Sequence, residues 1–197
     1  FSFFATRWLG IIGPVLTAAL VLGVAFIVVV GLLAFTGSPG DCSPGGGPIT
    51  VSVTTSEAFK QKWDDFNATL DGGSPTSVTF NESEISSRTD AFLRENDAPF
   101  SDARVCIHDG FGEAMASLDA FLGLDAKIKV KGTLDLTGDH PVAHIDDIEI
   151  GNVPGFISDR VEGLLEDAIE DQLEDIDLKH TYTPALTEGQ ALIDGQP

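Results

Sequence analysis

Two histidines in the second half of the chain are the residues whose spacing most resembles a metal site. His140 and His144 are four positions apart, a spacing that places two imidazoles on one face of a helix. The residues between them, Pro-Val-Ala, instead predict a turn followed by a strand. In a strand the two side chains would be about 13 Å apart. We therefore interpret both as ordinary surface histidines and expect no metal.

Paired carboxylates offer a second kind of chemistry. Asp146 and Asp147 could act as a general acid and base, but no nucleophile or electrophile stands nearby. The apolar alternation slips by one residue at this pair, which favours a β-bulge. The acidic face expected on the helix after Pro154 could collect calcium weakly, but no D-x-D-x-D-G loop is present. A solvated acidic face is the better interpretation.

The motifs of common enzyme classes are missing from the sequence. It contains no G-x-S-x-G elbow, P-loop, H-E-x-x-H or Rossmann glycine pattern, so we expect neither catalysis nor a cofactor. Two cysteines with scattered histidines do not make a zinc site. Cys42 and Cys106 could form one disulfide, although nothing in the sequence shows that they meet.

The longest apolar stretch runs from Trp8 to Phe35 and carries no charged residue. A bilayer core needs roughly 20 helical residues, so this stretch predicts a transmembrane helix, and Pro14 is tolerated near its start. A cleaved signal peptide has a shorter apolar region, which favours a retained anchor. Close packing against other membrane helices is expected at its small residues, Gly10, Gly13, Gly23 and Gly31.

Charge sets the expected orientation and the partners. Arg7 precedes the apolar stretch, and no further Lys or Arg occurs until Lys60. The positive-inside rule then places the N-terminus in the cytoplasm and the remainder in the periplasm or outside the cell. The whole chain carries a net charge of −20. This excludes a basic footprint for nucleic acid and a polybasic contact with anionic lipid.

A segment rich in Gly and Pro, residues 36–48, is expected to separate the anchor (1–35) from one domain (49–197). A strand is predicted over Ile49–Thr54, then a capping box from Thr54 to Glu57 and a helix over Ser56–Leu70. Apolar residues recur on this helix at spacings of four, three and four: Phe59, Trp63, Phe66 and Leu70. Such a stripe usually packs in a core.

The remaining domain predicts mostly strands. A strand over Ser77–Phe80 leads to a helix capped by Asn81 with Glu84 at its third position. Alternation then predicts antiparallel strands from Ser101, with a hairpin turn at Asp109-Gly110. One face holds Gly112, Ala114, Ala116, Leu118, Ile128, Val130, Gly132 and Leu134, and the other holds Lys127, Lys129 and Lys131. Two short strands flank a turn at Glu188-Gly189.

A long amphipathic helix is predicted after Pro154. Its apolar stripe is Ile157, Val161, Leu164, Leu165, Ala168, Ile169, Leu173 and Ile176. The expected fold class is therefore α+β: a single N-terminal transmembrane helix, followed by an extracytoplasmic domain with a curved antiparallel meander sheet packed on the long helix.

Two stretches resemble a known family. VTFNESEISSRTDAFL is similar to the first strand and helix of bacterial membrane-anchored YpmS-like proteins, and IEIGNVPGFISDRVEGLLEDAI looks like their strand and long amphipathic helix. The resemblance covers roughly residues 49–195. It implies a tubular lipid-binding (TULIP-type) domain, in which a curved sheet wraps a long helix around an apolar groove, and it implies no catalytic residues.

Two functions remain open at this point. The first is a non-catalytic accessory subunit of a membrane assembly, which contacts membrane lipids and other subunits. The alternative is a membrane-tethered binder of lipid or another apolar ligand. For that function the candidate groove residues are Ala114, Ala116, Leu118, Val130, Leu134, Leu164 and Ile169. A bound lipid would distinguish the two.

Overall fold

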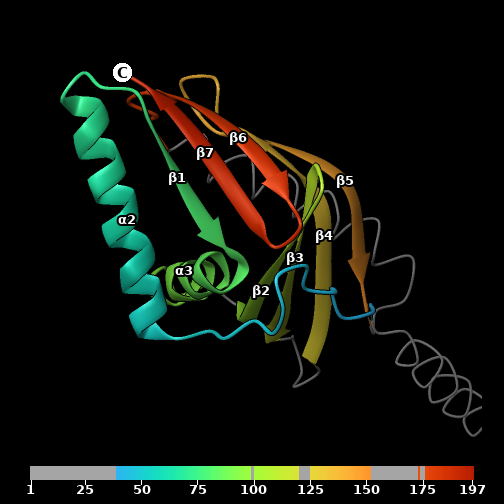
Figure 1. Ribbon diagram of the computed structural model, residues 1–197. Coiled ribbons are helices and arrows are strands. Elements are labelled where there is room, and N and C mark those ends of the chain that lie inside the picture. The colour runs from blue at the N-terminus through green and yellow to red at the C-terminus, as the bar shows by residue number, and fades with distance from the viewer. Residues whose placement is uncertain (1–38, 99, 120–124, 152–172, 174–175) are drawn as a thin grey trace, which may run out of the picture. The chain divides into compact units, whose positions relative to one another are not determined.

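A computed structural model of the chain describes residues 39–98, 100–119, 125–151, 173 and 176–197 (Figure 1). The chain divides into two compact units, Phe1–Gly37 and Ser38–Pro197. The predicted Trp8–Phe35 helix and its four glycines lie outside the described residues. Within the described ranges, no helix combines the length and the apolar character that crossing a membrane requires.

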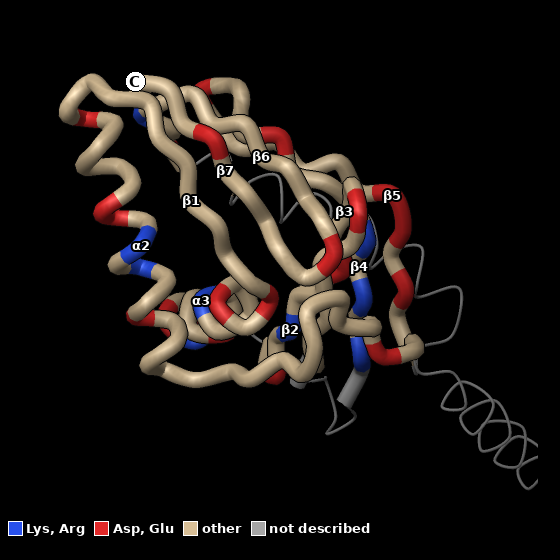
Figure 2. Tube along the Cα trace, viewed as in Figure 1, with Lys and Arg blue, Asp and Glu red and all other residues tan. Residues whose placement is uncertain are grey.

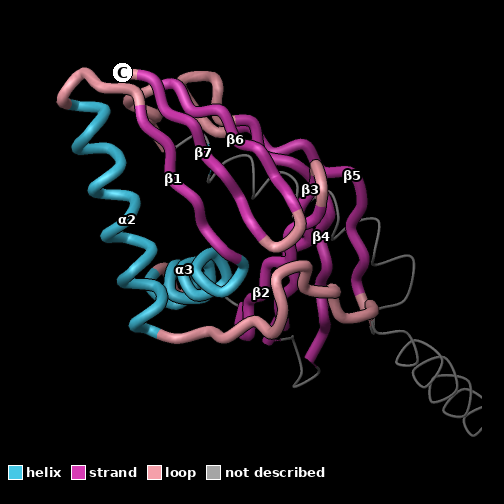
Figure 3. Tube along the Cα trace, in the orientation of Figure 1, coloured by secondary structure: helices cyan, strands magenta, loops and turns pink. Residues whose placement is uncertain are grey.

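The second unit has the predicted α+β class. Its described residues form two antiparallel sheets, one with the strand order β1-β7-β6 and one with the order β2-β3-β4-β5. Figure 3 shows the two described helices, α2 and α3, gathered at one side of the strands. The elements are α2 (Val53–Asp71), β1 (Thr76–Asn81), α3 (Glu82–Glu95), β2 (Phe100–His108), β3 (Phe111–Asp119), β4 (Asp125–Asp135), β5 (Val142–Ile150), β6 (Thr181–Thr187) and β7 (Gln190–Gln196).

The four-stranded sheet is the predicted meander. Gly110 adopts φ +82° at the turn between β2 and β3, a backbone conformation that glycine enters without a steric penalty. Lys131 of β4 pairs with Asp147 of β5, whereas the next residue, Gly132, pairs with Ile145. Asp146 is therefore the extra residue of a β-bulge, and the prediction of a bulge at this acidic pair is confirmed.

The three-stranded sheet joins distant parts of the sequence. β1 pairs with β7, with Thr76 opposite Gly195 and Asn81 opposite Gln190. The turn at Glu188-Gly189 between β6 and β7 is as predicted, and Gly189 has φ +76°. The short strands were expected, but their assembly into a second sheet was not, because pairing over this separation leaves no local pattern.

The start of α2 corrects the sequence prediction. Residues 49–52 form no strand, and the helix begins at Val53. The Ser52 side chain accepts a hydrogen bond from the Thr55 N–H at 3.1 Å, so Ser52 is the N-cap and the predicted capping box at Thr54 and Glu57 is wrong. The β-branched residues around Ser52 favour a strand, but the serine side chain supplies a helix N-cap instead.

The start of α3 matches the prediction. The Asn81 side chain accepts from the Glu84 N–H, and the Glu84 carboxylate accepts from the Asn81 N–H, both at 3.0 Å. This reciprocal pair is the predicted capping box. Phe92 of this helix is 41% exposed and lies beneath the Arg88 guanidinium.

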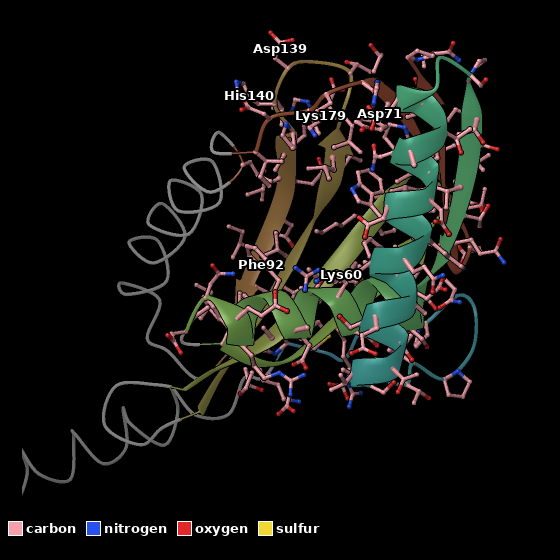
Figure 4. The ribbon with its side chains drawn as sticks, turned by 90° about the vertical axis from the view of Figure 1, so that its left-hand side faces the viewer. Lys60, Asp71, Phe92, Asp139, His140 and Lys179 are labelled. Atoms are coloured by element: carbon pink, nitrogen blue, oxygen red, sulfur yellow. A yellow bond between two sulfur atoms is a disulfide. The ribbon has the colours of Figure 1, made fainter. Side chains whose placement is uncertain are left out.

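An aromatic core lies where α2 meets the three-stranded sheet. We call it the aromatic cluster; its buried members are Phe66, Leu70, Leu136 and Tyr182, with Trp63 packed against them. The predicted stripe of α2 therefore packs in a core. Figure 4 shows α3 crossing the lower end of α2, with Asp71 at the upper end. There the Asp71 carboxylate contacts His180 at 3.0 Å.

The predicted long helix falls almost wholly on residues 152–172 and 174–175, outside the described residues. The same holds for Leu164 and Ile169, two of the candidate groove residues. Ile176, expected to end the apolar stripe, is not helical and is 42% exposed.

The segment that precedes α2, residues 39–52, is attached to the domain, and we call it the strap. Cys42 forms a disulfide with Cys106 of β2, closing a sequence separation of 64, which resolves the pairing that the sequence left open. Most of the segment expected to separate anchor and domain, Pro39 to Pro48, thus belongs to the compact unit.

Glu82 holds the strap from the other side. It is only 3% exposed, and its carboxylate accepts the N–H groups of Gly45 at 2.9 Å, Gly46 at 3.0 Å and Ile107 at 2.8 Å. Three charge-assisted hydrogen bonds satisfy a buried carboxylate and make it a strong link. A Cβ added at Gly189 would collide with Gly46, so strap and β6–β7 turn meet backbone to backbone.

Candidate ligand cavity

A cavity of about 730 Å³, from here on called the cavity, lies between the two sheets. Side chains from α2, α3 and both sheets contribute to its wall. The described lining residues are Phe59, Phe80, Ile85, Val105, Ile107, Gly110, Gly112, Ala114, Val130, Gly132, Thr133, Leu134, Leu136, Ala143, His144, Ile145, Pro184, Ala185, Leu186, Ala191 and Ile193. Its volume falls within the range of about 300–1,000 Å³ that is typical of ligand pockets.

Small residues of the four-stranded sheet create this space. Gly112 of β3 pairs with Gly132 of β4, and Ala114 pairs with Val130. Ala114 remains exposed although it lies within a strand that is paired on both sides. A Cβ added at Gly112 would find its nearest neighbour, the Cys106 carbonyl oxygen, only at 3.8 Å. The sheet therefore presents a hollow to the opposite wall.

Backbone hydrogen bonds connect the two sheets that form the cavity. The Gly110 N–H donates to the Leu186 carbonyl at 3.1 Å, and the Gly189 N–H donates to the Ile107 carbonyl at 2.9 Å. Toward the aromatic cluster, the Tyr182 N–H donates to the Leu136 carbonyl at 3.3 Å. These bonds fix the two sheets to each other.

The opposite wall is rigid and aromatic. The rings of Phe59 and Phe80 lie 4.2 Å apart between centroids, and Phe80 is only 1% exposed. Buried side chains in contact with one another hold their rotamers, so this wall gives the cavity a fixed apolar surface.

The lining has almost no polar side chain. Among the described lining residues, only Thr133 and His144 are polar, and they pair with each other across β4 and β5. No Asp, Glu, Lys or Arg is among them. Within the described part of the chain, no group of three His, Cys, Asp or Glu residues could hold a metal ion. The described wall therefore suits an apolar ligand.

The charges of the four-stranded sheet lie on its other face. The Lys129 ammonium pairs with the Glu149 carboxylate at 2.6 Å, and this hydrogen bond raises the pKa of Lys129 above its usual value. Lys131 lies over the Phe111 ring, 4.2 Å from its centroid. Figure 2 shows basic positions along β4 beside acidic positions along β5. The predicted alternation thus separates a charged outer face from an apolar inner face.

The predicted groove residues divide into three groups. Ala114, Val130 and Leu134 line the cavity. Ala116 instead lines a second pocket of about 510 Å³ beside the strap, near the point where the Cys42 N–H approaches the Met115 sulfur at 2.8 Å. Leu118 lies in β3, but its side chain, like Leu164 and Ile169, is outside what the structure describes.

The two histidines singled out by spacing have separate surroundings. His140 lies in the turn before β5, where its Nδ1 is 3.1 Å from the Ile176 carbonyl oxygen. His144 lies within β5, opposite Thr133 of β4. The interpretation as a turn followed by a strand is confirmed.

The sequence does not predict the part of the cavity wall that β6 and β7 form. Pro184 and Leu186 of β6 and Ile193 of β7 line it, yet those strands were expected only as a short tail. Their alternating pattern was the available signal, and the missing information was the sheet that they join.

A scan of protein-family models, a search of curated proteins and a search of solved structures each found no match to this chain. The resemblance to YpmS-like proteins therefore stays a prediction.

Proposed function

We propose that this chain is a non-catalytic, membrane-anchored protein whose domain binds an apolar ligand, such as the acyl chain of a lipid, in the cavity. The observation that carries the proposal is the 730 Å³ space with apolar walls between two connected sheets. Burying apolar surface contributes about 25 cal/mol per Å², so a chain filling this space would be held without any charged contact.

The proposed location rests on the sequence and on one structural feature. The apolar stretch Trp8–Phe35 would be the single membrane span, with the N-terminus in the cytoplasm. The disulfide between Cys42 and Cys106 supports an extracytoplasmic domain, because disulfides persist in oxidising compartments.

Two substitutions of the same kind test the proposal. Ala114→Phe places a ring inside the cavity, whereas Ala116→Phe places the same ring two residues along β3 in the second pocket. The full chain is extracted gently from its own membrane and examined by native mass spectrometry. We expect a lipid-sized mass on the wild type and on Ala116→Phe, and its loss from Ala114→Phe. An unliganded wild-type chain would contradict the proposal.

A structural role in a membrane assembly is the second candidate. The net charge of −20 favours it, because an acidic surface suits docking on a basic partner. In the same experiment this function predicts stable protein neighbours and no ligand on the domain. Retention of partners that Ala114→Phe leaves unchanged, with no lipid present, would favour this role over ligand binding.

A further inference from the structure

We infer that the cavity binds one acyl chain at a time and selects single-chain lipids over two-chain lipids. This inference rests on the proposed function and adds the class of ligand. It follows from three observations. The first is the volume of the cavity, and the second is that His144 is the only ionisable side chain among its described lining residues. The third is the set of small residues that determine the depth of the cavity.

Volume limits the cavity to one chain. A methylene group is about as large as a water molecule, which occupies roughly 30 Å³. One palmitoyl chain of about 16 carbons then needs about 480 Å³ and two need about 960 Å³. The cavity measures about 730 Å³. A single chain fits within this volume, whereas two chains exceed it and would leave part of one chain in water.

Charge keeps the headgroup outside. None of the described lining residues is Lys, Arg, Asp or Glu, and His144 is the single ionisable side chain among them. A phosphate or carboxylate within the cavity would find no permanently charged partner among these residues, and burying an unpaired charge is strongly unfavourable. Leu134 lines the cavity and is 42% exposed, so the apolar wall continues to the surface. The shared chemistry of the ligand is therefore one apolar chain with its polar end in water, whether from a free fatty acid or from a lysolipid.

Small residues set the length of chain that fits. Ala114→Leu adds three carbons to the wall and removes about 90 Å³, which equals about three methylene groups of ligand. Val130→Ala removes two carbons from the paired position in β4 and enlarges the space. Each methylene that loses its place in the cavity weakens binding about fourfold. The two variants should therefore shift the preferred chain length in opposite directions.

The test is native mass spectrometry of the purified full chain, delipidated and then titrated with three probes: palmitic acid, palmitoyl lysophosphatidylcholine and dipalmitoyl phosphatidylcholine. We expect one molecule of a single-chain probe per protein and at least tenfold weaker binding of the two-chain lipid. The two single-chain probes distinguish a fatty acid from a lysolipid as the source of the chain. Equal affinity for the two-chain lipid, or two single-chain molecules per protein, would overturn the inference and leave the proposed function standing.

Failure of all three probes to bind would instead contradict the proposed function itself. Chain length provides the second measurement, with a series of saturated fatty acids. The preferred length should shorten by about three carbons in Ala114→Leu and lengthen by about two in Val130→Ala. Ala116→Leu, the control in the second pocket, should keep the wild-type preference. An unchanged preference in both cavity variants would sink the idea that this wall measures the chain.

Discussion

The two ends of the domain interior differ in how they are filled. In the aromatic cluster, Phe66 is 4% exposed and Tyr182 2%, and their ring centroids lie 5.8 Å apart. Along β3 and β4, by contrast, Gly112 faces Gly132 and Ala114 remains exposed. One interior thus contains a packed region and a hollow region, joined by the Tyr182–Leu136 hydrogen bond.

The packed region and the hollow region therefore have different roles: the first stabilises the fold, and the second leaves space for a ligand. Close packing contributes most of the stability where large side chains interlock. Space for a ligand requires the opposite, and it is tolerated here because the two sheets are already fixed by backbone hydrogen bonds and by the packed end. Substitutions of the same kind should therefore cost very different amounts at the two ends.

The largest expected effect is the loss of a packed ring. Phe66→Ala should lower the free energy of unfolding by about 3–5 kcal/mol, because it leaves a void among buried side chains. Leu134→Ala, at a cavity residue that is 42% exposed, should cost less than about 1 kcal/mol. Chemical denaturation of both variants measures the difference. Equal costs would show that the cavity wall is packed and would break the comparison.

A matched pair of glycines sharpens the comparison further. A Cβ at Gly195 would lie 2.6 Å from atoms of both Leu70 and Phe66, which are buried and cannot yield freely. Gly195→Ala should therefore cost about 1–3 kcal/mol through overpacking.

Gly112→Ala is the counterpart at the cavity. It meets nothing closer than 3.8 Å and should raise stability by up to about 1 kcal/mol, by restricting the unfolded chain. Thermal unfolding should order the proteins with Gly112→Ala highest and Gly195→Ala lowest. The reverse order would place the hollow at the wrong end.

The smallest expected effect is a raised pKa of Tyr182, which absorbance spectroscopy can follow. Tyr182 is the single tyrosine of the chain, and burial, followed by the nearby Asp71 charge, raises its pKa above the ordinary value of 10.0. Stability from this group is fully present below pH 10, the value for the unfolded chain, and is lost as pH rises toward the folded-state pKa.

A tyrosinate absorbance titration follows this residue directly. We expect a midpoint above pH 10 for the folded protein and near 10 in denaturant. Tyr182→Phe should remove the loss of stability above that pH. A folded midpoint at the ordinary value would indicate that the aromatic cluster admits water.

Local patterns predicted the local structure. The capping box of Asn81 and Glu84, the turn at Asp109-Gly110 and the bulge at Asp146 each depend on residues within a few positions of one another. The strict alternation along β4 gave its inner and outer faces. For the same reason the sequence pattern alone identifies Ala114, Val130 and Leu134 as candidate ligand contacts.

Contacts between residues far apart in the sequence could not be predicted from local patterns. Glu82 was visible only as an acid at a helix start, yet its carboxylate accepts from N–H groups 36 and 37 residues earlier and 25 residues later. The pairing of β1 with β7 has no local signature either. Ala114 and Ala116 are equivalent in an alternating pattern, and only the course of the strap across β3 distinguishes them.

The disulfide also determines how the domain responds to tension. A pull applied to the chain ahead of Cys42 passes through the sulfur bridge into β2 at Cys106. The residues between the two cysteines, which are 64 apart in sequence, include both described helices and β1 and lie within a covalent loop that this pull does not extend. The load instead reaches the β2–β3 pairing first, so the mechanical attachment point of the domain is β2, an edge strand of the four-stranded sheet, and not the start of the first described helix.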